Sequence, residues 1–186
     1  MTTETAFDRL INICRELFRK KAYDYGASWR IFRPTSMTDQ LFIKAKRIRS
    51  IEEKGEQKVA DSIESEYIGI INYSIMALML LDEPLSESDW SALANVDVEA
   101  LVSQYDEKAT IVRQTLLAKN HDYGEAWRDM RITSCTDMIL SKILRIKQIE
   151  DHQGSTLVSE PVSQNYVDIV NYAVFAWIKL IETQNS

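Results

Sequence analysis

The sequence repeats itself at an offset of 98 residues, and this duplication limits the possible folds more than any other feature. When residues 21–52 are placed over residues 119–150, 16 of the 32 positions are identical. Unrelated segments of ordinary composition would share roughly two such positions. After a shift of one further residue, three more positions match, as Tyr67/Tyr166, Asn72/Asn171 and Tyr73/Tyr172. We therefore predict two copies of one structural unit that pack against each other.

Each copy is predicted to contain three helices. The chain holds only 5 Gly and 3 Pro, and so few residues that end regular elements favour long helices over many short strands. Apolar residues also recur at helical spacing in the first helix of copy one. The predicted helices cover about residues 5–22, 36–54 and 61–81 in copy one, and about residues 99–119, 134–151 and 161–182 in copy two.

Local signals predict where some of these helices begin and end. Ser36 or Thr38 is expected to cap the second helix, since a hydroxyl can accept from the N–H groups of the first turn. Asp39 would then lie in that first turn, where a negative charge favours the helix dipole. Gly26 can adopt the left-handed conformation that ends the first helix. A short helical turn is expected around residues 90–94.

The third helix of copy one is apolar on nearly all sides in its second half, which indicates a position at the centre of a bundle. One copy alone could not bury this surface, whereas two copies packed together could. We predict an all-α, six-helix bundle with internal pseudo-two-fold symmetry that resembles a fused dimer. Residues 1–81 would form the first repeat, residues 82–98 a linker and residues 99–186 the second repeat of one compact domain.

Composition and charge exclude several classes of partner. The net charge is −6 and the pI about 5.1, which argues against broad binding to duplex DNA or to anionic lipid. The longest apolar stretch, residues 67–81, is too short for a confident membrane span. Residues 1–9 are polar and predict no signal peptide. Cys14 and Cys135 match no metal or redox spacing, so we expect free thiols in a cytoplasmic protein.

Two pairs of basic residues are candidates for phosphate binding. Lys44 and Arg47 lie three residues apart, and so do Lys142 and Arg145 in copy two. This spacing places each pair on one face of a helix, where two cations can bind an anion. An exposed basic face with salt bridges explains the same pattern, so both interpretations stay open.

Polar residues on the third helix of copy two form a second candidate site. Asp168, Asn171 and Tyr172 project from one face of an otherwise apolar helix, where they need partners if they are buried. They could bind a metal or the hydroxyl groups of a sugar, or form a structural network in which Asp168 pairs with Arg145. Copy one has Gly69 in place of the aspartate. If the acid is chemically active, only copy two holds a complete site.

Aromatic and charged residues near the helix ends give a third set. Asp122, Tyr123 and Trp127 surround a glycine turn, so the aromatic rings could stack on a base while Arg128 contacts a phosphate. The same residues could instead form a simple turn with a buried tryptophan. Glu160 could bind a cation or stabilise a helix N-terminus. No Ser-His-Asp or Cys-His arrangement and no Gly-rich phosphate loop is present.

Taken together, these motifs resemble a bacterial and phage family called nucleotide modification associated domain type 1. Its pattern has a lysine before Asp-Tyr-Gly, a nearby aromatic, then Lys-x-x-Arg and an acidic segment that ends in Asn-Tyr-Ala. In copy two the matching residues are Lys119, Asp122, Tyr123, Gly124, Trp127, Lys142, Arg145, Glu160, Asp168, Asn171, Tyr172 and Ala173. In copy one they are Lys21, Asp24, Tyr25, Gly26, Lys44, Arg47, Asn72 and Tyr73. Gln164 departs from the pattern, because the family has an acid there.

This resemblance implies a role in nucleotide handling. The family is also distantly similar to the MazG-like all-α nucleoside triphosphate pyrophosphohydrolases, which hold Mg²⁺ with Glu-x-x-Glu on one helix and Glu-x-x-Asp on the next. Here Asp168, Glu160 and Asp137 would be the metal ligands, and Asp168 with Glu160 the catalytic pair. The sequence has no Glu-x-x-Glu that could face Asp168, although Mg²⁺ often uses only one or two carboxylates.

Two functions follow as hypotheses. In the first, the protein binds a small nucleotide and hydrolyses a nucleoside triphosphate with Mg²⁺. Phosphates would lie on Lys142 and Arg145, completed across the pseudo-dimer by Lys44 and Arg47, and Tyr123 and Trp127 would face the base. In the second, it is a non-catalytic helical binding or assembly module that uses the same polar residues as an ion-pair network. The chain would act as a monomeric pseudo-dimer or as a homo-oligomer.

Overall fold

Six α-helices form the part of the chain that the structure describes. The computed structural model describes residues 1–84, 87–155 and 161–184, and no β-strand occurs within these ranges. The helices are α1 (Thr3–Tyr25), α2 (Pro34–Lys54), α3 (Ile63–Asp82), α4 (Val98–Tyr123), α5 (Ile132–Asp151) and α6 (Val162–Gln184). Short 3₁₀ turns are η1 (Ser28–Ile31), η2 (Glu87–Ala92) and η3 (Ala126–Asp129). The predicted fold class is therefore confirmed.

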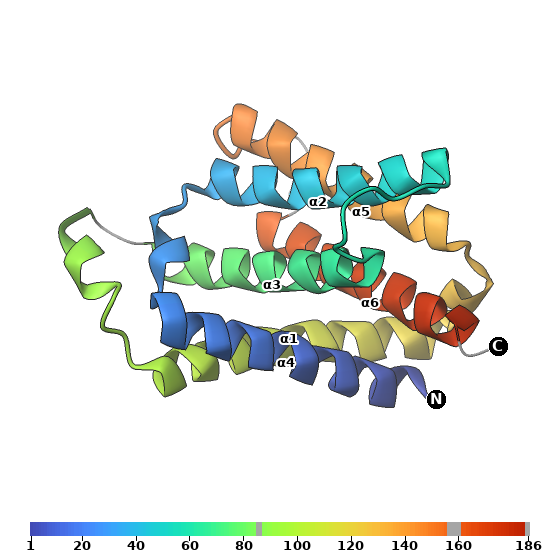
Figure 1. Ribbon diagram of the computed structural model, residues 1–186, viewed down its shortest axis with the longest axis horizontal. Coiled ribbons are helices and arrows are strands. Elements are labelled where there is room, and N and C mark those ends of the chain that lie inside the picture. The colour runs from blue at the N-terminus through green and yellow to red at the C-terminus, as the bar shows by residue number, and fades with distance from the viewer. Residues whose placement is uncertain (85–86, 156–160, 185–186) are drawn as a thin grey trace.

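The helices are arranged in three layers, and each layer pairs a helix with its repeat-related counterpart. Figure 1 shows α1 beside α4, α3 beside α6 and α2 beside α5, with the α3–α6 layer in the middle. This middle layer holds the most apolar helices, because only there can a helix be covered on all sides. Each half therefore buries its apolar faces against the other half, as expected for a fused dimer.

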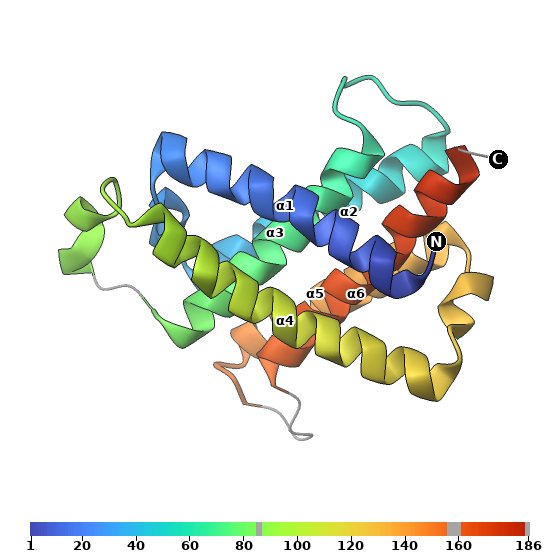
Figure 2. The ribbon, with the colours of Figure 1, turned by 90° about the horizontal axis from the view of Figure 1, so that it is seen from below.

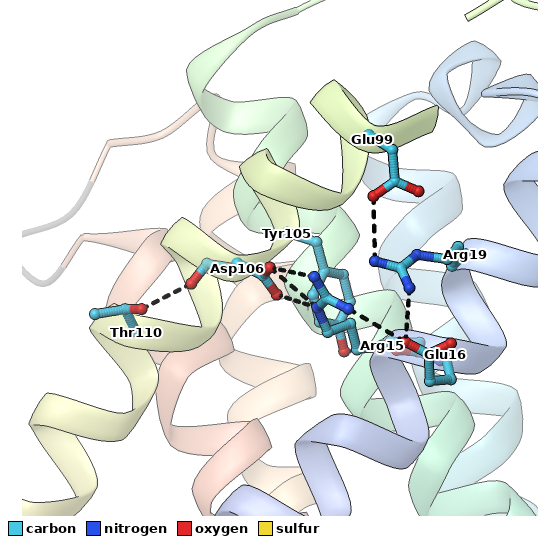
Figure 3. A network of polar contacts seen from close by, with 8 residues as sticks. Arg15, Glu16, Arg19, Glu99, Tyr105, Asp106 and Thr110 are labelled. Atoms are coloured by element: carbon cyan, nitrogen blue, oxygen red, sulfur yellow. Dashed lines mark hydrogen bonds and ion pairs between the residues drawn. The ribbon is translucent and has the colours of Figure 1, made fainter. Parts of the chain in front are cut away.

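Ion pairs between α1 and α4 follow the same pseudo-two-fold symmetry. Arg15 of α1 binds Asp106 of α4 with two parallel hydrogen bonds of 2.7 and 2.8 Å, as Figure 3 shows. At the related position, Arg113 of α4 binds Asp8 of α1 at 2.7 and 3.1 Å. Such paired bonds fix the geometry of the contact more firmly than a single bond would. Figure 2 views this layer from below.

A second pair of symmetric contacts joins α2 to α5. The buried Thr38 hydroxyl donates to Glu150 at 2.7 Å, and the buried Thr136 hydroxyl donates to Glu52 at 2.8 Å. Burial raises the pKa of both Glu52 and Glu150 above the ordinary value, and each threonine bond offsets only part of that effect. Tyr166 lies 3.2 Å from the Thr38 hydroxyl, and burial raises its pKa to about 12.

The start of α2 differs from the prediction. Pro34 occupies the first helical position, which suits its fixed backbone angle and missing N–H group. Arg33 is therefore the N-cap, no side chain caps the helix, and the prediction of a Ser36 or Thr38 cap is wrong. Thr38 lies a turn inside the helix, and Asp39 forms an ion pair with Lys147 of α5 instead of lying in the first turn.

The two halves differ where their first helices end. Gly26 lies under the linker, since a Cβ atom there would meet the Leu93 carbonyl oxygen at 2.1 Å. Its angles, φ 60° and ψ −141°, are not those of the predicted left-handed cap. Gly124 has the left-handed conformation, and the space around its Cα is open. The turn at Gly124 is thus open, whereas the turn at Gly26 is covered by the linker.

Other features agree with the sequence. Cys14 and Cys135 are buried free thiols, and burial raises the pKa of Cys135 to about 11. Within the part of the chain that the structure describes, none of the helices has the length and apolar character needed to cross a membrane.

Candidate functional site

A pocket of about 360 Å³ opens in the second half, between α4, η3 and α6. Its lining is mostly apolar and aromatic, with a few polar side chains, which is the usual composition of a small-molecule site. The lining residues are Leu116, Lys119, Asn120, Tyr123, Ala126, Trp127, Met130, Asp168, Asn171, Tyr172 and Phe175. We call this the second-half pocket.

Aromatic side chains form one wall of the second-half pocket. Trp127 stacks on Phe175 with ring centroids 4.5 Å apart and an angle of 6° between the planes. Tyr172 meets Phe175 edge to face. Tyr123, in the last turn of α4, also lines the pocket and is 73% exposed. The arrangement offers flat surfaces to a planar ligand.

Arg128 supports this wall from behind. Its guanidinium lies 4.6 Å from the centre of the Trp127 ring and binds Glu125 at 2.7 Å. Glu125 in turn accepts a hydrogen bond from Thr3, near the N-terminus. Arg128 does not line the pocket, so its predicted contact with a phosphate would require these bonds to break.

Asp168 forms the charged part of the pocket. Its side chain is only 8% exposed, and it accepts from Lys119 at 2.5 Å, Lys142 at 2.8 Å and Gln164 at 3.1 Å. Burial alone would raise the pKa of Asp168, but the bonds and charges of the two lysines outweigh it and hold the pKa below the usual range. The described charged partners of Asp168 are thus two lysines, whereas the structural hypothesis named Arg145.

Asn171 stands out because its amide has no hydrogen-bond partner among the described residues, although it is only 4% exposed. The related Asn72 has a partner for each of its two amide atoms: it donates to the Cys14 carbonyl at 3.2 Å and accepts from the Tyr105 hydroxyl at 2.8 Å. The repeat places Phe7 at the position of Tyr105, and phenylalanine has no hydroxyl. One half therefore satisfies its asparagine and the other does not.

The first half has a related pocket of about 470 Å³, lined by Lys21, Tyr25, Trp29, Lys44, Glu66, Gly69, Asn72 and Tyr73 among others. We call this the first-half pocket. Figure 1 shows that the connection from α1 to α2 and the connection from α4 to α5 lie at opposite ends of the molecule. The two pockets are therefore separate.

The basic pair of the first half is bound to an acid that the sequence analysis did not single out. Lys44 lies 3.1 Å and Arg47 2.5 Å from the two carboxylate oxygens of the buried Glu66. Neither side chain lines the second-half pocket, so they do not complete a site across the pseudo-dimer. Comparison of the two copies does not identify Glu66, because the related position in copy two is an asparagine, Asn165.

The remaining predicted site residues are not gathered at Asp168. Asp122 is exposed beside His121, and Asp137 forms an ion pair with Arg49 of α2 at 3.4 Å. Glu160 lies outside the described residues. The lysine Lys119 was recognised only as part of the family pattern, although its identity with Lys21 was a visible signal.

The residues around Asp168 do not offer a Mg²⁺ site as they stand. Mg²⁺ prefers oxygen ligands and several waters, whereas Asp168 is held between two ammonium groups. Among the residues that the structure describes, no three Asp, Glu, His or Cys side chains gather in one place.

Comparison with known proteins explains why both halves carry a pocket of the same design. The family model described as nucleotide modification associated domain 1 matches residues 21–81 and again residues 119–180, together more than half of the chain. The chain belongs to this family. Each match begins at the lysine that lines a pocket, Lys21 or Lys119. Searches of curated proteins and of solved structures gave no match. The similarity to MazG-like enzymes stays a prediction.

Proposed function

We propose that the protein is a nucleotide-binding protein and that the second-half pocket holds the nucleoside. The observation that carries the proposal is the Asn171 amide, which is buried in the pocket without a partner among the described residues. A buried amide without hydrogen bonds costs about 1–3 kcal/mol. A ligand that offers one donor and one acceptor side by side would remove that cost, and every nucleobase has such an edge.

The pocket walls support a planar heterocycle of this kind. The exposed Tyr123 ring lines the pocket beside the stacked pair of Trp127 and Phe175 and can lie against a base, and stacking of a base on an aromatic side chain contributes about 1–3 kcal/mol. The indole N–H of Trp127 is also buried without a partner in the described chain, so it can donate to the ligand. A volume of about 360 Å³ is within the range of small-ligand sites.

Lys119 is the residue that can reach a phosphate. Its side chain is 46% exposed, whereas that of Lys142 is only 13% exposed. Lys119 can therefore turn from Asp168 toward a phosphate, while Lys142 stays on the carboxylate and keeps the buried charge paired. This division replaces the predicted use of Lys142 with Arg145, since Lys142 is the more buried of the two lysines that bind Asp168.

Hydrolysis of a nucleoside triphosphate is the more specific form of this proposal, and it needs a metal that the site does not hold in this arrangement. The helical assembly module is the alternative. A module would need no unsatisfied amide in an open pocket, so Asn171 favours ligand binding over it.

A calorimetric titration with nucleosides and with nucleoside mono-, di- and triphosphates, each with and without Mg²⁺, tests the proposal. Asn171→Leu removes the amide and should weaken binding about tenfold or more, since a lost hydrogen bond to a buried partner is worth 1–3 kcal/mol. The same variant should not lower the unfolding temperature of the unliganded protein, because the amide makes no bond there.

Asn72→Leu is the matched control. It should destabilise the protein, since it leaves the buried Tyr105 hydroxyl without its acceptor. If Asn171→Leu destabilises the protein as much as Asn72→Leu does, or if no nucleotide binds at millimolar concentration, the proposal is wrong.

A further inference from the structure

The first-half pocket differs from the second-half pocket in its charges, and this difference points to a second ligand. We propose that the first-half pocket is an anion site that takes a phosphate group carried on an aromatic ligand, with Lys21 as the principal cation. This pocket shares none of its described lining residues with the second-half pocket and does not depend on whether that pocket binds a nucleoside.

The first step of the argument concerns Lys44 and Arg47. Both oxygens of Glu66 are taken, one by Lys44 at 3.1 Å and the other by Arg47 at 2.5 Å. Glu66 is buried, and its single negative charge compensates one of these two cations while its bonds fix the positions of both side chains. Arg47 does not line the first-half pocket, and Lys44 lines it with its ammonium group held by Glu66, so neither is the principal cation for a further anion, although the sequence singled them out for that role.

The second step concerns position 69. The related residue in the other half is Asp168, which binds Lys119. Gly69 has no side chain, and the side chain of Lys44 lies across it, with its Cε atom 2.7 Å from the position that a Cβ atom would occupy. The first-half pocket therefore lacks the carboxylate that pairs with the lysine of α4 in the second half.

Lys21 is left with its charge uncompensated. It lines the first-half pocket, and it makes no hydrogen bond or ion pair with any residue that the structure describes. Asp61 also lines this pocket, but Arg47 donates to its backbone carbonyl at 2.6 Å and so places a guanidinium beside it. A phosphate monoester, with a charge of about −1.5 to −2 at pH 7, matches a lone ammonium at a pocket mouth.

The pocket walls select an aromatic carrier for this phosphate. Trp29, Tyr25 and Tyr73 line the pocket, which at about 470 Å³ is larger than the second-half pocket. The Trp29 indole N–H is buried and has no partner in the described chain, so it adds a neutral donor on a residue of the same lining. Asn72 is not available to form hydrogen bonds with a base here, because its amide is hydrogen-bonded to the Cys14 carbonyl and the Tyr105 hydroxyl.

Titration of the whole protein with phenyl phosphate tests the inference. This probe carries an aromatic ring and a phosphate but no base edge, so binding does not report on Asn171. Lys21→Met should weaken binding about tenfold or more, because it removes a charge-assisted bond. Gly69→Asp should do the same by placing a carboxylate beside the lysines, and only the flexible end of Lys44 must move to admit it.

Lys20→Met is the matched control. Lys20 is an adjacent exposed lysine outside the pocket, so the variant makes the same change in net charge and should bind phenyl phosphate as the wild type does. The indole N–H signal of Trp29, assigned with Trp29→Phe, should shift during the titration. The inference is overturned if phenyl phosphate does not bind at millimolar concentration, if Lys21→Met binds it like the wild type, or if Lys119→Met abolishes binding instead.

Discussion

At the scale of single residues, one hydroxyl group decides whether the asparagine of each half has a hydrogen-bond donor as its partner. Tyr105 of α4 satisfies Asn72 of α3, while the repeat gives Phe7 of α1 as the counterpart that would face Asn171 of α6. Both aromatic side chains are almost fully buried. A change of one atom thus separates an asparagine used for structure from one that is left for a ligand.

Phe7→Tyr should close the second-half pocket to its ligand. The new hydroxyl would donate to Asn171 as Tyr105 does to Asn72, which should stabilise the unliganded protein by about 1 kcal/mol and weaken nucleotide binding. Thermal unfolding and calorimetric titration measure the two effects. A variant that loses stability and binds nucleotide like the wild type would show that Phe7 does not face Asn171 in this way.

Asp168→Asn should destabilise the protein at neutral pH by roughly 3 kcal/mol, because it removes the buried carboxylate charge that accepts from both Lys119 and Lys142. The native pKa of Asp168 is below its unfolded value, so its contribution is present above the unfolded pKa and is lost as the pH falls through the native pKa. The difference in free energy of unfolding between variant and wild type should therefore shrink in acid. A difference that stays constant down to pH 2 would contradict the ion-pair account.

At the scale of helices, the α2–α5 layer carries two acids with the opposite behaviour. Glu52 and Glu150 have raised pKa values, so the native state binds their protons more tightly than the unfolded state does. Stability then falls as the pH rises from the unfolded pKa, about 4.3, through the native pKa. The charged forms are thus slightly unfavourable at pH 7.

The double variant Glu52→Gln, Glu150→Gln should raise the unfolding temperature at pH 7 by a few degrees. Glutamine keeps an oxygen that accepts from Thr136 or Thr38 and carries no charge. The gain should vanish below about pH 4, where both glutamates are protonated. A loss of stability at pH 7 would mean that the carboxylate charges are needed.

The helices themselves could largely be predicted from the sequence, and their ends could not. The scarcity of Gly and Pro and the apolar spacing were enough to place all six. The start of α2 was missed because Pro34 at the first position outweighed the hydroxyls of Ser36 and Thr38. Gly26 was expected to be a left-handed cap, but the linker that presses on it comes from 67 residues further along the chain, at Leu93.

For the molecule as a whole, the repeat predicted the pseudo-two-fold fold because identical residues need identical surroundings. It predicted the candidate site less well, because a comparison of two copies shows only what they share. Asp168, Asn171, Tyr123 and Trp127 were found and do lie in one pocket. Glu66 and the contrast between Tyr105 and Phe7 were missed, since these are the positions where the copies differ.

The second half alone, residues 98–184, should form a homodimer. Arg113 of one copy can bind Asp106 of the other, as Arg15 does in the intact chain. Thr136 can likewise meet Glu150 and Tyr166 of the other copy. Analytical ultracentrifugation of this fragment measures its mass, and a folded monomer would contradict the fused-dimer account.

The side-chain amides of Asn171 and Asn72 give the most direct test of the central claim, which is that the second-half pocket binds a nucleotide through a free asparagine. Both can be followed in one heteronuclear NMR spectrum while a nucleotide is added. The account predicts that the Asn171 amide signals shift strongly and those of Asn72 stay in place. A titration that shifts Asn72 alone, or leaves both unchanged at millimolar nucleotide, would contradict it.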